Sequence, residues 1–600
     1  MYVLSGEIMK FTGSLEELKE KLEPMSTVCN WNESNLAQIQ IRHQNKGIMN
    51  WYSSTGTINF QGDEVGRKEL ERLVTEYITG EVAIIENEDN ISDVVATIPE
   101  LENQDDSSKQ QEFIESPQDS ELVIGLVGAV GSRLGSVQER FEGLLTNHFN
   151  YQVETISVSK DVISKLPSTN IDKTSEYSRI SSSMDAGNKL RKESGDNSFL
   201  SSCIVERISE LRDGTGGEFR ARTAYIVSSL KHPEEVIRLR RIYGAGFFLV
   251  SVYEDITSRT RYLTDDKNID SSDATKLIAR DSNESSDYGQ HTTDAFHMAD
   301  YFLHLDDSNT RLSNDTKRFL DLIFGNPYVT PTFDEYANFM AFSAALRSAD
   351  LSRQVGAVVS RDETILATGA NDVPKSGGGL YWPQYDEETH TVKDVDNGRD
   401  YMKGFDPNVH ARHEIVEDII ERLPEEQRAE VKKAIMSSKL KDITEYGRCV
   451  HAEMEALMSC ARERISTKKT TLYTTTFPCH NCAKHIIAAG VSRVVFVEPY
   501  PKSKALDFHA ESVKLGFSAE ENWVVFVPFV GVGPRRFFDL FSMSLGAGYS
   551  LARKNKDGTT IDWNAGTSQL RMQMLPYSYV EREKQTISIV ARLKGKLETN

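Results

Sequence analysis

One histidine, one glutamate and two cysteines stand at spacings that could build a catalytic metal site. Glu453 follows His451 closely, and Cys479 and Cys482 form a C-x-x-C pair directly after Pro478. Histidine nitrogen and cysteine sulfur bind zinc tetrahedrally, and a catalytic zinc site keeps one position for a water molecule, whose pKa the metal lowers. With the histidine and both cysteines as ligands, Glu453 remains free to move the protons of that water. The four residues therefore predict a zinc-dependent hydrolysis.

Two helices must position these side chains. We expect one over His451–Arg462 and one over Cys479–Ala489, since a proline directly before the second suits a helix start. The ligands then lie in first turns, where the helix dipole favours thiolate over thiol. The alternative is a closed structural zinc site with Cys449 or His480 as fourth ligand. Glu453 would then have no chemical role.

The pattern H-x-E…P-C-x-x-C is typical of zinc-dependent nucleobase deaminases. In that reaction the activated water attacks C4 of a cytosine ring, and Glu453 carries a proton to N3 and then to the departing ammonia. Residues Phe333–Phe508 resemble the deoxycytidylate deaminases of the cytidine deaminase superfamily. The segments that carry the resemblance are Phe339–Met340, Leu346–Ser348, Gln354–Ala357, Gly369–Asn371 and Cys482–Gly490. The resemblance implies the three-layer cytidine deaminase fold.

The same resemblance implies two substrate contacts. Asn371 would bind the deoxyribose hydroxyl, although a turn asparagine is the alternative, and Tyr500 would lie near the base. The chain departs from the family at Asp372, which stands where glycine is usual. It also carries a long insertion, Ser376–Arg448. Both departures fall where the sugar and phosphates are expected, so the number of phosphates on the substrate stays open.

Composition narrows the class of protein further. The chain has 600 residues, a net charge of −21 and six cysteines. That length predicts roughly four domains of about 150 residues, and so few cysteines indicate a reducing, cytoplasmic setting. The acidic balance opposes broad binding to nucleic acid. We expect neither a membrane span nor a secretory signal, because no long apolar run is present.

The pattern along the chain predicts five segments. These are a small α/β module (1–85), an acidic linker (86–120), a nucleotide-binding domain like the P-loop kinases (121–325), the deaminase domain (326–550) and a C-terminal tail (551–600). In the first module, Ser14 and Glu17 form a capping box for a helix over Leu15–Leu22. In the third segment, alternating strands and helices predict a parallel sheet. Its expected strands are Leu122–Val127, Tyr151–Ser157, Thr223–Val227 and Gly246–Tyr253.

A glycine-rich turn follows the first strand of that sheet. Gly128, Gly131 and Ser132 could cradle phosphates through backbone N–H groups. The P-loop pattern also needs a lysine before the final hydroxyl residue, and here Arg133 is the nearest cation. Three interpretations remain open: a simple tight turn, nucleotide binding without efficient phosphoryl transfer, or an active kinase.

The order of a degenerate P-loop domain before a deaminase resembles the bacterial anti-phage dCTP deaminases. The resemblance spans about residues 120–545. It implies conversion of dCTP to dUTP, possibly also of dCMP to dUMP, which depletes the pool that a phage needs for replication. By this resemblance Lys375, Arg399, Lys502 and Arg535 contact phosphates, or they form surface salt bridges.

A constitutive enzyme of this kind would deplete the host's own dCTP. We therefore expect control through residues 1–330 by a nucleotide or an RNA, and a homo-oligomer, since related deaminases often assemble. The competing functions are a housekeeping dCMP deaminase and an RNA or DNA cytosine deaminase. The net charge of −21 opposes the polynucleotide alternative.

Overall fold

The computed structural model describes residues 9–74 and 119–599, with gaps at 12, 23–28, 36–37, 44–47, 54, 63–66, 68–69, 72, 168, 213–218, 283–287, 439, 441–444, 501, 518–519 and 575. The chain divides into two compact units, Met1–Asp105 and Asp106–Asn600. The predicted acidic linker, 86–120, lies outside the described residues except for 119–120.

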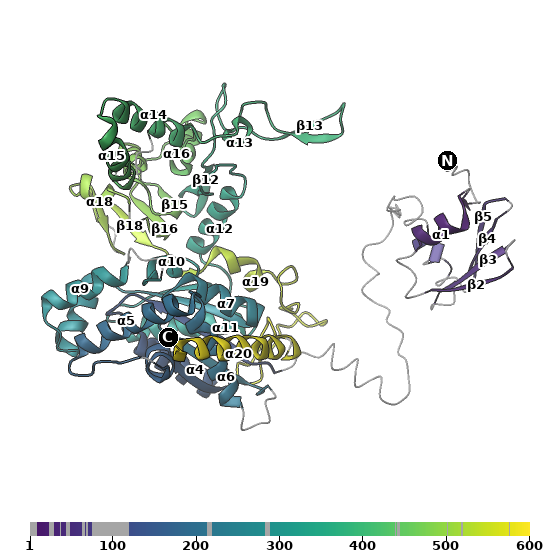
Figure 1. Ribbon diagram of the computed structural model, residues 1–600, viewed down its shortest axis with the longest axis horizontal. Coiled ribbons are helices and arrows are strands. Elements are labelled where there is room, and N and C mark those ends of the chain that lie inside the picture. The colour runs from purple at the N-terminus through teal and green to yellow at the C-terminus, as the bar shows by residue number, and fades with distance from the viewer. Residues whose placement is uncertain are drawn as a thin grey trace. The chain divides into compact units, whose positions relative to one another are not determined.

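The first unit is an antiparallel sheet with a short helix packed on it (Figure 1). Its strands in spatial order are β1 (Met9–Lys10), β5 (Thr57–Gln61), β4 (Ile48–Tyr52), β3 (Gln38–His43) and β2 (Cys29–Asn35). Helix α1 (Leu15–Lys21) has the predicted capping box: the N–H of Glu17 donates to the Ser14 hydroxyl at 3.2 Å, and the N–H of Ser14 donates to the Glu17 carboxylate at 2.8 Å. Leu18 and Trp51 belong to one buried cluster, so this unit has its own core.

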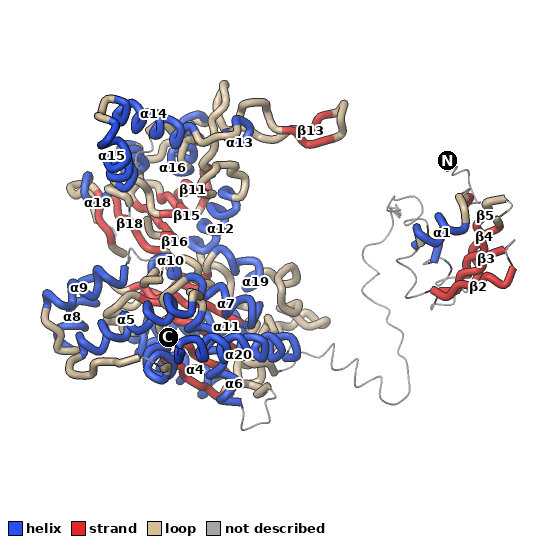
Figure 2. Tube along the Cα trace, viewed as in Figure 1, coloured by secondary structure: helices blue, strands red, loops and turns tan. Residues whose placement is uncertain are grey.

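The described part of the second unit contains two six-stranded sheets and a two-stranded hairpin (Figure 2). The first of these sheets, the central sheet, has the order β19-β10-β9-β6-β8-β7 and is parallel except for β19. Its strands are β6 (Leu122–Gly128), β7 (Gln152–Ser157), β8 (Thr223–Ser228), β9 (Phe247–Tyr253), β10 (Tyr301–His304) and β19 (Gly531–Val532). The four strands predicted here are confirmed to within one residue at each end.

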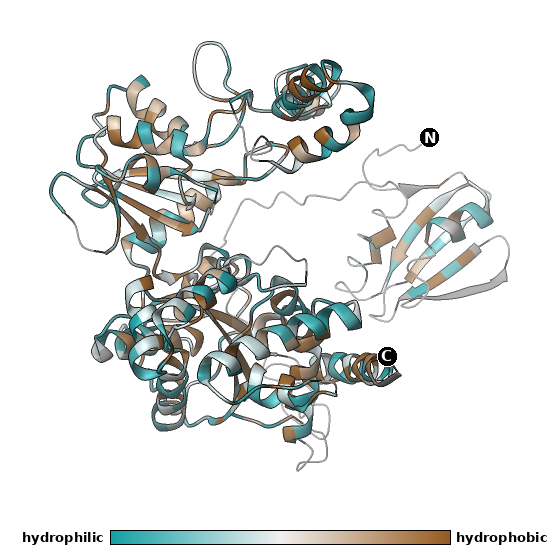
Figure 3. Ribbon diagram, turned by 60° about the vertical axis from the view of Figure 1, so that its left-hand side comes forward, coloured by the Kyte–Doolittle hydropathy of each residue, from teal (hydrophilic) through white to brown (hydrophobic). Residues whose placement is uncertain are grey.

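Helices cover both faces of the central sheet. The helices of this part of the chain are α4 (Leu134–His148), α5 (Glu176–Ser194), α6 (Phe199–Arg212), α7 (Pro233–Tyr243), α8 (Ile256–Arg261), α9 (Ser271–Ser282), α10 (Thr292–Phe296) and α11 (Asn309–Ile323). Of these, α9 packs on α5 in a separate buried cluster. Side chains alternate along each strand, so Leu126 of β6 packs with α4 and α11, whereas Val127 packs with α6 and α7. The apolar strands lie between these layers (Figure 3).

The C-terminal segment belongs to this central layer. Residues 551–600 were expected to form a tail, but helix α20 (Pro576–Thr599) packs against α6. Buried Arg212 of α6 donates to Glu583 of α20 at 2.9 Å and to Glu121, just before β6, at 2.7 Å. A buried guanidinium needs such partners, and the pairing of distant residues cannot be read from local sequence.

The second sheet lies in the predicted deaminase domain and is called the deaminase-region sheet. It has the order β12-β11-β15-β16-β18-β17. Its strands are β11 (Gly356–Arg361), β12 (Thr364–Ala370), β15 (Thr471–Thr476), β16 (Arg493–Glu498), β17 (Val513–Leu515) and β18 (Val524–Pro528). The helices around it are α12 (Phe333–Ala345), α16 (Ala452–Arg462), α17 (His480–Ala488), α18 (Ala505–Phe508) and α19 (Phe537–Phe541). Glycines allow two of these helices to pack directly on the strands: a Cβ on Gly356 would lie 1.9 Å from a carbonyl of α12, and one on Gly369 would lie 2.2 Å from a carbonyl of α16.

The insertion Ser376–Arg448 forms a subdomain of its own elements. They are β13 (Gln384–Asp386), β14 (Thr391–Lys393), α13 (Asp400–Lys403), α14 (Pro407–Glu421) and α15 (Glu425–Ser437). The expectation of a mixed α/β protein is confirmed. Among the described residues, no helix combines the length and the apolar character that crossing a bilayer requires.

Candidate active site

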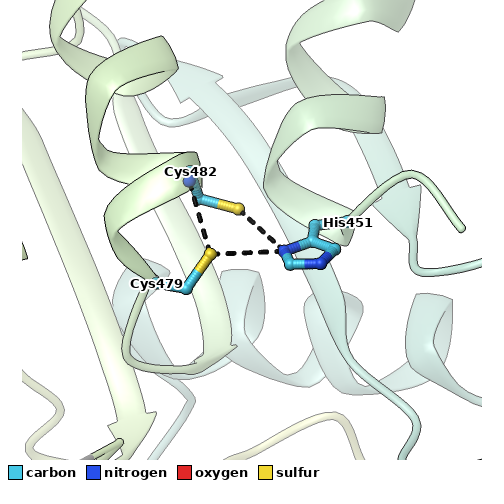
Figure 4. A group of neighbouring side chains, drawn as sticks. All are labelled: His451, Cys479 and Cys482. Carbon is cyan, nitrogen blue, oxygen red and sulfur yellow. Dashed lines mark hydrogen bonds between the residues drawn. The ribbon is translucent and has the colours of Figure 1, made fainter. Parts of the chain in front are cut away.

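Two helix starts bring the predicted metal ligands together. His451 is the N-cap of α16 and Cys479 is the N-cap of α17, one residue outside the helices in which we expected them. The Nδ1 of His451 lies 3.4 Å from the Sγ of Cys479 and 3.3 Å from that of Cys482 (Figure 4). One ligand atom from each residue lies within 4.8 Å of the others. Imidazole with two sulfurs at this spacing fits a zinc ion.

Glu453 lies beside this cluster in the first turn of α16. Its side chain is buried, with the residue 4% exposed, and its Oε2 lies 3.3 Å from the Sγ of Cys482. Burial raises the pKa of this carboxyl. Within the described residues, the group of potential ligands contains neither Cys449 nor His480, so the structure provides no fourth ligand of the closed zinc site considered above. A carboxylate therefore stands next to an open three-ligand site.

The pKa values of the three candidate ligands are shifted in different directions. The hydrogen bond with Cys479 and burial raise the pKa of the Cys482 thiol well above its usual range. Hydrogen bonds from Cys482 and His451 lower the pKa of Cys479 to about 4, and thiolate is the form that binds zinc. The hydrogen bond with Cys479 raises the pKa of His451 to about 9 despite burial. Since a histidine ligand must be neutral, zinc binding would release this proton.

The cluster opens into a cavity of about 670 Å³. Its walls come from four stretches, 350–355, 400–408, 447–453 and 476–480, together with Asn371, Tyr500, Lys502 and Lys504. The second stretch belongs to the insertion, so the insertion forms part of the wall of the candidate site. A cavity of this size suits a small molecule.

Comparison with known proteins agrees with this geometry. A family model described as the cytidine and deoxycytidylate deaminase zinc-binding region matches residues 331–498. A deoxycytidylate deaminase of Mycobacterium phage D29 is 30% identical over 173 residues, which are 29% of this chain and 96% of that protein. This chain belongs to the deoxycytidylate deaminase family. The prediction of zinc is also confirmed, because the matching region is a zinc-binding one and the chain holds a suitable cluster.

Smaller shares of other relatives match this chain. A deoxycytidylate deaminase of Saccharomyces cerevisiae is 26% identical over 175 residues, which are 29% of this chain and 40% of that protein. The chain spans at most 40% of the length of the first curated relatives that it matches. A crystal structure of dCMP deaminase from the cyanophage S-TIM5 aligns with 33% of this chain and 99% of that one, at 18% identity and a TM-score of 0.19.

Asn371, the predicted sugar contact, holds one wall of the cavity in place. The Oδ1 of Asn371 accepts from the N–H of Val355 at 2.6 Å, and its Nδ2 donates to the carbonyl of Arg353 at 2.8 Å. Asn371 thus fixes the 353–355 stretch of the wall. Tyr500 also lines the cavity, with the guanidinium of Arg353 5.4 Å from the centre of its ring.

Of the four cations predicted to contact phosphate, only Lys502 lines this cavity. Arg399 is 5% exposed and lies 3.4 Å from Asp372 and 3.1 Å from Asp394. The aspartate that replaces the family's usual glycine therefore anchors the insertion through Arg399. Lys375 is exposed at the start of the glycine-rich loop that follows Asp372 in the chain. Arg535 lies near Arg240 and Asp300 of the central layer.

Three other cations line the cavity and were missed. Arg353 precedes the first strand of the deaminase-region sheet, Lys504 follows Tyr500, and Arg448 ends the insertion. Arg448 donates to Asp400 at 2.8 Å. The sequence could have predicted the position of Arg448, because a residue three positions before a predicted metal ligand must lie near the site.

The buried position of Arg399 leads to a prediction. Arg399→Met should lower the free energy of unfolding by about 3 kcal/mol, because it leaves buried Asp372 and Asp394 without their cation. Urea unfolding measures the effect, and Lys375→Met is the matched control on an exposed cation. Equal stability of both variants would show that the Arg399 pairs contribute nothing.

The predicted phosphate-binding turn lies at the carboxyl end of β6. Gly128 ends that strand, Gly131 has a φ of 85°, and Ser132 stands two residues before the first residue of α4. Three N–H groups of the turn already have partners: Val130 donates to the carboxylate of Asp281 at 2.7 Å, Arg133 to that of Glu254 at 3.0 Å, and Ser132 to the carbonyl of Ala129 at 3.0 Å. Nucleotide binding at this turn therefore stays a prediction.

Proposed function

We propose that this protein hydrolytically deaminates deoxycytidine nucleotides. The observation that carries the proposal is a buried carboxylate, Glu453, beside an open cluster of one imidazole and two sulfurs in a cavity large enough for a nucleotide. Membership of the deoxycytidylate deaminase family supports the choice of substrate. A structural zinc site would not need a buried proton carrier.

His451, Cys479 and Cys482 would hold zinc, and Glu453 would carry protons. When bound, zinc lets a water molecule lose a proton near neutral pH. Glu453 accepts this proton and delivers it to N3 of the cytosine ring while the water oxygen forms a bond to C4. The bond from C4 to the amino nitrogen then breaks. Glu453 passes the remaining water proton to that nitrogen, which leaves as ammonia, and the ring becomes uracil.

The other cavity residues would orient the nucleotide. Asn371 keeps one amide hydrogen and one lone pair beyond its bonds to the wall, which suffices for a sugar hydroxyl. Tyr500 would contact the base. Lys502, Arg353 and Arg448 provide positive charge in the same cavity, as binding of phosphates requires.

We further propose that the substrate is dCTP, and that the reaction depletes the nucleotide pool during phage infection. The several cations of the cavity support a triphosphate, as does the resemblance to the anti-phage enzymes. The central sheet and its helices, 121–325, would control the deaminase region, 326–550, in response to a nucleotide or an RNA. A cytoplasmic homo-oligomer completes this proposal.

A panel of substrates tests the function. We expect purified protein to release ammonia from dCTP faster than from dCMP and CTP, with no uracil formed in single-stranded DNA. Chromatography of the nucleosides and sequencing of the DNA measure these outcomes. Activity on dCMP alone would indicate the housekeeping alternative, and uracil in DNA alone would contradict the proposal.

A further inference from the structure

A phenylalanine that follows a strand of the deaminase-region sheet lies at the carboxyl end of a strand of the central sheet. Phe517 follows β17, and its ring stacks on His304, the last residue of β10, with 3.7 Å between ring centres and 13° between planes. The Tyr253 ring lies 5.8 Å away and the Arg311 guanidinium 5.7 Å away. Contact of a flat ring with an aromatic side chain and an arginine is also the way in which proteins hold nucleobases.

The position of this stack is the place where such sheets bind ligands. Ligands of parallel α/β sheets bind outside the carboxyl ends of the strands, where the strand order reverses. Here β6 lies between β8 and β9, so the reversal falls at the end of β6. His304 ends β10, two strands away, which is about 10 Å at the usual strand spacing. His304 is 8% exposed, and its Nδ1 has no hydrogen-bond partner among the described residues.

Two buried carboxylates and a lysine meet the turn after β6. Asp281 of α9 is fully buried, accepts from the N–H of Val130 at 2.7 Å and pairs with the Nζ of Lys231 at 2.8 Å. Glu254, 3% exposed, accepts from both the backbone N–H and the Nε of Arg133, at 3.0 and 2.8 Å. Lys231 comes from the loop after β8, so a cation reaches this turn although the turn's own sequence lacks a lysine.

A chain of contacts joins the turn to the stack. The Nη2 of Arg133 donates to the carbonyl of Asp306 at 3.1 Å, and Arg311 lies 3.5 Å from the carboxylate of Asp306. Arg311 in turn faces the ring of Phe517. One nucleotide could span the same distance, with its phosphates at the turn and its base on His304.

We propose that these side chains occupy a regulatory nucleotide site, with Phe517 in the place of the base and Asp281 and Glu254 in the place of the phosphates. Nucleotide binding and docking of Phe517 then exclude one another. Phe517 lies between β17 and β18, and β18 pairs with β16, which leads to Tyr500 of the cavity. Release of Phe517 would therefore shift the strands that lead to a wall of the candidate active site. This inference rests on the proposed control of the deaminase by the central sheet.

Binding measurements on the full chain test the exclusion. We expect Phe517→Ala to bind ATP about tenfold more tightly than wild type in equilibrium dialysis, because no docked ring competes for His304. The affinity of the same variant for inorganic tripolyphosphate, which has no base, should stay unchanged. Asp281→Asn should bind both ligands more tightly. Leu515→Ala on β17 and Asp273→Asn on α9 are matched controls, and both should behave as wild type.

Either of two results for folded Phe517→Ala would overturn the proposal: an affinity for ATP equal to that of wild type, or an equal gain in affinity for tripolyphosphate. Thermal melting checks that each variant is folded. In the wild type, ATP should also speed hydrogen exchange at the N–H of Gly516, which donates to the carbonyl of Phe526. Deamination of dCTP is measured on the same samples. If the wild type deaminates dCTP but does not bind ATP, the regulatory site alone is refuted. If it does not deaminate dCTP, the proposed function is refuted.

Discussion

Glu453→Gln should lower the rate of dCTP deamination by about 10²–10⁴-fold, the usual contribution of a positioned proton carrier. Glutamine keeps the shape of the side chain and a hydrogen bond to Cys482, but it cannot accept a proton from water and deliver it to the ring. The Glu453 carboxyl is 4% exposed, so bulk water cannot easily replace it. Steady-state release of ammonia measures the loss.

The matched control lies on the same helix. Glu455 is also buried, but it pairs with Arg462 at 2.6 Å and does not line the cavity. Glu455→Gln should therefore keep most of the activity. Zinc content should equal that of wild type in Glu453→Gln, because Glu453 is not a ligand. Near wild-type activity in Glu453→Gln would refute the proposed mechanism.

Cys482→Ala should lose both zinc and deamination. The wild type is expected to hold about one zinc per chain, and removal of one of three protein ligands should leave almost none after dialysis. The loss follows from the geometry, since the Nδ1 of His451 lies 3.3 Å from the Sγ of Cys482. Elemental analysis of the dialysed protein measures the metal, and chelator treatment of the wild type should give the same loss of activity.

Cys460→Ala is the control for this experiment. Cys460 is fully buried in α16, the helix that begins after His451, but it is not part of the ligand cluster. This variant should keep its zinc. If Cys482→Ala also kept its zinc and its activity, the cluster could not be the metal site.

Local spacing predicted which residues come together at the candidate site. His451 and Glu453 lie at one helix start and Cys479 and Cys482 at another, so each pair is positioned by a few residues of regular backbone. The capping box of Ser14 and Glu17 and the strands of the central sheet were predictable for the same reason. Such features depend on interactions between residues that are close in the sequence.

Long-range contacts decided which cations line the cavity. Arg399 and Arg448 both belong to the insertion and look alike in the sequence. Folding buries Arg399 against Asp372 but places Arg448 in the wall of the cavity. Charge and composition could not separate them, because the difference lies in which carboxylate each one meets.

The sequence by itself predicted the zinc ligands, Glu453 and the class of substrate that we propose, because these predictions rest on residue types at short spacings. Only the tertiary structure decided how the regions of the second unit join. Helix α20 packs on the central layer through Glu583, β19 completes the central sheet, and Phe517 stacks on His304. Each of these contacts joins residues far apart in the chain, and such pairs are selected by burial and shape in three dimensions, which no local pattern records.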